Sequence, residues 1–284
     1  MLIPLHEPSF LLPLILTGML GMVTGFLLGS LGAGGSLLAL PAFLYAARLP
    51  VPVAVSTSLV VVGLTSAIGG VFAHIRCRRQ GCPGAEVSGW VALVMALCGL
   101  LGTLVGVRVA AHLMPVTQQG LLVVVLLGAA TALLHNAAAS RNDGEILSDL
   151  PAPVEEQALR QAAGAALPGF GVGVLTGILG VGGGFLLVPA LRFATGLTVR
   201  RATATSLWII AANAGFALLG YLQVNTPVDW GAASVFLALS VPGMLLGQRA
   251  ARGVPSSGLQ RGFAALLLGI AGWTVWTLLR LFLR

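Results

Sequence analysis

The stretch Leu31–Leu59 reads LGAGGSLLALPAFLYAARLPVPVAVSTSL, and Leu179–Leu207 reads LGVGGGFLLVPALRFATGLTVRRATATSL. The two stretches align without a gap at an offset of 148 residues, and 14 of the 29 paired residues are identical. Chance similarity between two apolar helices would match Leu, Val and Ala. Here the matches also include Gly32/Gly180, Gly34/Gly182, Gly35/Gly183, Pro41/Pro189, Thr57/Thr205 and Ser58/Ser206. The chain therefore contains an internal duplication.

The duplication extends in both directions from these stretches. The same offset pairs two small-xxx-small runs, which favour close helix packing: Gly21, Gly25 and Gly29 with Gly169, Gly173 and Gly177. Later in each half the offset shifts to 141, where Leu101–Arg108 matches Pro242–Arg249. We predict a first transmembrane repeat over residues 10–139, a polar cytoplasmic linker over 140–162 and a second repeat over 163–284.

Composition places the protein in a membrane. Of the 284 residues 57% are hydrophobic and 8% are charged, against roughly 25% charged in a soluble domain. Most of the windows between consecutive charges approach or exceed the ~20 apolar residues that cross a bilayer. They cover residues 8–47, 49–75, 87–107, 109–140, 161–191, 202–228, 230–248 and 262–279. The predicted class is an all-α polytopic membrane protein.

The distribution of arginine predicts the orientation of the two units. All 15 basic residues are Arg, and they lie at the edges of the apolar windows without a long basic run, so we read them as topology signals and expect no nucleic-acid partner. Two parallel four-crossing units would place seven Arg on one side and eight on the other. If each unit has an odd number of crossings and the second unit is inverted, eleven Arg lie on one side of the membrane and four on the other. This bias favours an inverted repeat. Each unit then has five crossings, or three crossings and a re-entrant hairpin bent at the glycine loop.

The glycine motifs are the candidate substrate site. Inverted-repeat transporters bind substrate where helices break near the bilayer midplane. Gly34-Gly35-Ser36 and Gly182-Gly183-Gly184, with Gly32 and Gly180 just before them, are predicted to break a helix in each unit and to let backbone approach a ligand. The N–H groups of a helix that starts there would attract a small anion.

Hydroxyl and amide side chains are further candidate donors to an oxyanion. They are Thr57, Ser58, Thr205 and Ser206, with Thr65 and Asn213 two turns further along each unit. The local alternative is that Ser and Thr in apolar helices bond back to the carbonyl four residues earlier. Arg108 and Arg249 also match between the units, and we interpret them as snorkelling residues rather than substrate ligands.

The acidic residues argue against cation transport. All eight lie outside the apolar windows or at their rims, so no carboxylate is available at mid-membrane: Glu7, Glu86, Asp143, Glu145, Asp149, Glu155, Glu156 and Asp229. Cys77, Cys82 and His74 are too few for a metal site of four good ligands. Ser36 and His74 suit no nucleophile–base arrangement. We expect no cofactor, no metal and no enzymatic activity.

The paired LGAGGSLLALP and LGVGGGFLLVP motifs, each followed by an A-x-x-T-S element, resemble the sulfite exporter TauE/SafE family of membrane permeases. The resemblance covers roughly Leu14–Ala138 and Ala163–Leu283. It implies export of sulfite, sulfoacetate or related small sulfur-containing anions across the cytoplasmic membrane, and a chain with about eight predicted crossings. A channel or a permease for another small solute is the alternative. The partners we expect are the lipid bilayer and a small anionic substrate, and the sequence leaves the oligomeric state open.

The inverted arrangement predicts which segments share a side of the membrane. Accessibility tags in the linker and in the loop after Arg76–Arg79 are expected on the same, cytoplasmic side, and tags at both termini on the opposite side. Labelling of intact and permeabilised cells with a membrane-impermeant reagent measures this directly. Tags in the linker and in that loop reporting from opposite sides would refute the inverted arrangement.

Overall fold

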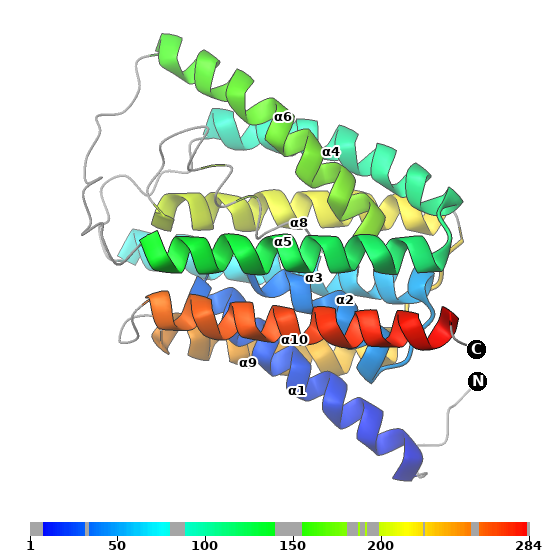
Figure 1. Cartoon of the computed structure of the whole chain (residues 1–284). Coiled ribbons are helices and arrows are strands. Elements are labelled where there is room, and N and C mark those ends of the chain that lie inside the picture. The colour runs from blue at the N-terminus through cyan, green and yellow to red at the C-terminus, as the bar shows by residue number, and fades with distance from the viewer. Residues whose placement is uncertain are drawn as a thin grey trace.

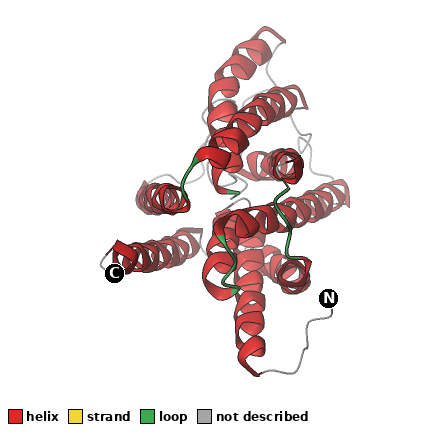
Figure 2. Cartoon of the chain, turned by 90° about the vertical axis from the view of Figure 1, so that its right-hand side faces the viewer, coloured by secondary structure: helices red, strands yellow, loops and turns green. Residues whose placement is uncertain are grey.

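The computed structural model describes residues 8–31, 34–79, 89–139, 155–180, 187, 191, 199–223, 225–250 and 256–282. Within these residues the chain forms helices joined by short loops, and no strand (Figure 2). The predicted all-α class is confirmed for this part of the chain.

The long helices follow the apolar windows of the sequence. They are α1 (Pro8–Leu31), α3 (Val51–Arg79), α4 (Gly89–His112), α5 (Pro115–Ala139), α6 (Glu155–Leu179), α8 (Val199–Gln223), α9 (Trp230–Ala250) and α10 (Ser256–Phe282). Three short helical pieces lie between α1 and α3, namely η1 (Gly34–Leu38), α2 (Ala39–Pro41) and η2 (Ala42–Ala46). Helix α6 begins inside the segment predicted as linker.

The pattern of burial is that of a multi-pass membrane protein. Among the described residues six helices, α3, α4, α5, α8, α9 and α10, are long and apolar enough to cross a bilayer. Large apolar side chains such as Leu101 and Val124 are more than half exposed, whereas many Ser and Thr side chains are buried. The apolar exterior suits lipid, and the polar groups of the interior find partners inside the protein.

In each of two pairs of parallel helices, the backbones of the two helices lie in close contact. On α1, a Cβ added to Gly25 would lie 1.9 Å from the carbonyl oxygen of Ser240 on α9. On α6, a Cβ at Gly173 would lie 2.0 Å from the carbonyl oxygen of Gly99 on α4. Ser240 and Gly99 are themselves related by the offset of 141 residues, and Gly25 and Gly173 by the offset of 148. The two interfaces are therefore equivalent, residue for residue.

The four most extensive helix interfaces all join one unit to the other. They are α4 with α6, α1 with α9, α5 with α10 and α3 with α8. In the last pair Gly63 faces Ala214, and Gly70 faces Trp208, so α3 and α8 run antiparallel. Helix α1 begins and α10 ends at one end of the helical bundle, and α5 ends and α6 begins at the other (Figure 1).

We predict that replacing a glycine at these interfaces lowers stability, whereas replacing a glycine away from them does not. Gly25→Ala and Gly173→Ala force the helices apart, and we expect each to lower stability by about 1–3 kcal/mol. Gly128→Ala on α5 is the matched control, because no other atom lies within 4 Å of its added Cβ. Thermal unfolding of the three variants in one detergent measures the effect. Equal melting temperatures for all three would contradict the close approach.

Candidate functional site

The Thr-Ser element of the first unit holds the start of α9. Ser56, Thr57 and Ser58 are fully buried on α3. The Ser56 hydroxyl donates to the Pro227 carbonyl at 2.7 Å, and Thr57 Oγ1 accepts the N–H of Asp229 at 3.1 Å. Asp229 in turn accepts the N–H of Ala232 at 2.9 Å through its carboxylate, which caps the N-terminus of α9. Thr57 is therefore occupied by a structural hydrogen bond.

Ser58 connects the first unit to the glycine motif of the second. Its hydroxyl lies 2.8 Å from the carbonyl oxygen of Gly180 and 2.8 Å from that of Val55, and it shares one proton between them. Gly180 has a φ of +65°, and a Cβ there would lie 2.7 Å from Val55 Cγ1. Both the left-handed backbone and the close contact require glycine at this position. The element A-x-x-T-S of one unit thus meets Gly180, the first glycine in the motif LGVGGG of the other.

The Thr-Ser element of the second unit differs from the first. Thr205 and Ser206 are fully buried on α8. Thr205 Oγ1 has no hydrogen-bond partner among the described residues. A buried hydroxyl without a partner costs about 1–3 kcal/mol, so this oxygen and its proton are available to a ligand.

Asn213 is the second unpartnered group on α8. Its side chain is 1% exposed, and neither its amide nitrogen nor its amide oxygen has a partner among the described residues. It lies at the middle of the candidate span Ala204–Gln223 and packs against Gly99 of α4, where an added Cβ would come within 2.5 Å of Nδ2. A buried side-chain amide therefore lies at the middle of a candidate span without a hydrogen-bond partner among the described residues.

Thr65, the counterpart of Asn213 in the first unit, behaves as the local alternative predicts. Its hydroxyl donates back to the carbonyl of Val61 at 2.7 Å. Since Gly63 of α3 faces Ala214 of α8, Thr65 and Asn213 lie at the same level along this antiparallel pair. The two Thr-Ser elements lie toward opposite ends of the pair, roughly 20 Å apart along the helix axes.

The remaining candidates divide between described and undescribed residues. Gly34, Gly35 and Ser36 belong to η1, and Ser36 is buried. Arg108 and Arg249 are exposed, which fits the interpretation of snorkelling side chains. Gly32, Cys82 and the run Gly182, Gly183 and Gly184 lie outside the described residues. The predicted meeting of two helix N-termini at the glycine loops stays a prediction.

Comparison with known proteins identifies the family. The family model described as "Sulfite exporter TauE/SafE" matches residues 17–274. The chain belongs to the TauE/SafE family. It is 32% identical, over 93% of its length and 95% of the relative's, to a "Probable membrane transporter protein" of Xylella fastidiosa strain 9a5c. A relative of the same description in Methanocaldococcus jannaschii is 34% identical over 34% of this chain and 36% of its own. No solved structure matches the chain.

This membership makes the protein a membrane transporter, which is consistent with the expectation that it is not an enzyme. In this TauE/SafE protein, sequence reasoning missed Ser66. The side chain is fully buried on α3 and its hydroxyl has no partner among the described residues. Its counterpart in the second unit is Ala214, so the duplication gave no signal there.

We predict that the same substitution at the two matched threonines, Thr57 and Thr205, affects stability differently. Thr57→Val leaves the Asp229 N–H without its acceptor, and we expect a loss of about 1–3 kcal/mol. Thr205→Val, the matched change in the second unit, removes a buried hydroxyl that has no partner, so the TauE/SafE protein should keep or gain stability. Thermal unfolding of both purified variants tests this difference, and an equal loss in the two would count against it.

Proposed function

We propose that this protein exports small sulfur-containing oxyanions, such as sulfite or organosulfonates, across the cytoplasmic (inner) membrane. The anion would pass along the interface of α3 and α8, where Asn213 and Thr205 offer hydrogen-bond donors. Asn213 lies near the middle, Thr205 lies toward one end, and Gly180, held by Ser58, lies toward the other.

Asn213 carries the proposal. It is a neutral donor of two N–H groups, it is buried at mid-membrane, and it has no partner among the described residues. A buried polar group of this kind is costly unless a ligand or water pairs with it. An oxyanion accepts hydrogen bonds and donates few or none, which matches the amide N–H groups of Asn213 together with the hydroxyl of Thr205.

The positions of the described acidic residues support an anionic rather than a cationic substrate. They are Glu155 and Glu156 at the start of α6 and Asp229 just before α9, and none lies inside a candidate span. A cation site at mid-membrane would require carboxylates or carbonyl ligands aimed inward. Uncharged donors hold an anion without trapping it, and release is required on each transport cycle.

The proposed architecture is an inverted repeat in which a glycine-rich break interrupts the first helix of each unit. Three observations support it. The equivalent helices α3 and α8 run antiparallel, the interfaces α1–α9 and α6–α4 are equivalent in register, and α1 ends at Leu31 just before a new helical piece begins at Gly34. Such units alternate access to a central site by rocking against each other.

Replacing Asn213 tests the proposed site. We expect Asn213→Ala to raise the apparent KM for sulfite about tenfold or more, because a hydrogen bond to a charged ligand contributes about 1.5–3 kcal/mol. Thr65→Ala is the matched control at the equivalent position and should leave the KM unchanged. Flux into proteoliposomes is measured for sulfite, thiosulfate, sulfoacetate and sulfate.

Three outcomes of the flux assay would contradict the proposal. An unchanged KM for Asn213→Ala would exclude this residue from the site. A flux that does not saturate, with single-channel currents, would establish the alternative of a channel. Saturable flux of another solute with none of the four anions would establish a permease of different specificity.

A further inference from the structure

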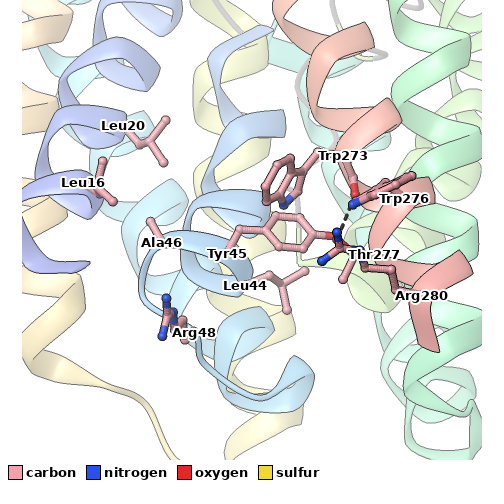
Figure 3. Close-up of a pocket in the computed structure, with 10 residues that line it drawn as sticks. All are labelled: Leu16, Leu20, Leu44, Tyr45, Ala46, Arg48, Trp273, Trp276, Thr277 and Arg280. Atoms are coloured by element: carbon pink, nitrogen blue, oxygen red, sulfur yellow. Dashed lines mark hydrogen bonds between the residues drawn. The ribbon is translucent and has the colours of Figure 1, made fainter. Parts of the chain in front are cut away.

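A cavity of about 570 Å³ lies toward the C-terminal end of α10, and none of its lining residues belongs to α3 or α8. It is bounded by α1, by the η2 segment and by the last turns of α10 (Figure 3). Its lining includes three leucines, three large aromatic side chains and two cations, among them Leu16, Leu20, Tyr45, Trp273, Arg48 and Arg280. The lining contains no acidic residue.

The two arginines lie at the depth of lipid headgroups. Arg280 is the last residue of the candidate span Gln260–Arg280, and Arg48 precedes the candidate span Val51–Ile75 by three residues. Trp273 is seven residues before Arg280 on α10, which places it about 10 Å deeper in the bilayer. The cavity therefore has a cationic rim at the interface and an apolar wall toward the hydrocarbon core.

Neither arginine is neutralised within the described part of the chain. Arg280 lies over the ring of Trp276 at 4.8 Å, and no ion pair joins it to an acid. Arg48 has a φ of 54°, a left-handed conformation that is uncommon for a residue with a Cβ. The hydrogen bond from the Leu49 N–H to the Phe43 carbonyl, at 3.0 Å, closes the turn that holds it there. Two exposed cations thus border one cavity without counter-charges.

The apolar wall is exposed to the lipid side. Leu16 is 44% exposed and Trp273 is 60% exposed, and Leu20 lies one turn after Leu16 on the same face of α1. A soluble anion would satisfy the arginines and leave this wall bare. An acyl chain covers the wall while its phosphate reaches the arginines, so the combination matches an amphiphile.

We propose that the cavity binds one anionic phospholipid from the leaflet in which α10 ends. The anionic headgroup lies at the rim that carries Arg48 and Arg280, and an acyl chain runs along Leu16, Leu20 and Trp273. The lipid fills the space between α1 and α10, which belong to different units, and so connects them at this end of the bundle.

Native mass spectrometry of the detergent-purified protein tests the proposal with phosphatidylglycerol and with phosphatidylcholine of the same chains. We expect tighter binding of phosphatidylglycerol, weakened about fivefold by Arg48→Gln and by Arg280→Gln. Arg108→Gln, which changes an exposed arginine of α4 outside the cavity, is the matched control and should bind like the unchanged protein. Trp273→Ala should weaken the binding of both lipids.

Two results would overturn the proposal. One is equal binding of the two lipids, or binding of phosphatidylglycerol that neither arginine variant weakens. The other is displacement of phosphatidylglycerol by millimolar inorganic phosphate, which would identify a site for a free anion. Because the readout is lipid binding, either result leaves the proposed transport of oxyanions standing.

Discussion

The close approach of glycine-lined helices is the contact on which the rest of the structure depends. Within a bilayer the hydrophobic effect does not drive helices together, because lipid chains are as apolar as leucine. Association then rests on dispersion and on backbone proximity, which small residues allow. At Gly25 and Gly173 a carbonyl oxygen of the facing helix lies where any other residue would carry its Cβ. The helices α1 and α6 are therefore fixed in one register on α9 and α4.

These contacts cross between the units and so determine what lies in the middle. With α1 held on α9 and α6 held on α4, the remaining long helices pair as α3 with α8 and α5 with α10. The α3–α8 pair carries half of the buried polar side chains among the described residues. Ser58, Ser66, Thr205 and Asn213 are among them. The polar line through the bundle follows from the glycine faces, and Gly99 of the α4 face contacts its central residue, Asn213.

The sequence predicted the repeat and its glycine faces, because identical glycines four residues apart mark a helix surface. The same offsets of 148 and 141 residues relate the contacts between α1 and α9 to the contacts between α6 and α4. The partner of each face was not predictable, since Gly102 and Gly106 on α4 could as well have packed within their own unit. Thr57 and Thr205 look alike in sequence. They differ in the structure because Thr57 meets the backbone of Asp229, and no feature of the α3 sequence records that contact.

The two units also differ at the centre of the α3–α8 pair. Thr65 and Asn213 lie at the same level, close to the point where the antiparallel helices cross, and a symmetric pair there would form a symmetric site. The Thr65 hydroxyl is instead satisfied by its own helix, whereas the Asn213 amide is open and faces α4 at Gly99. In the proposed transport cycle an anion at this level would bind off the axis, on the α8 side. The inward-facing and outward-facing states would then differ in energy, and in their affinity for the anion, even though the scaffold is duplicated; the direction of net flux is still set by the gradients of the substrate and of any coupled ion.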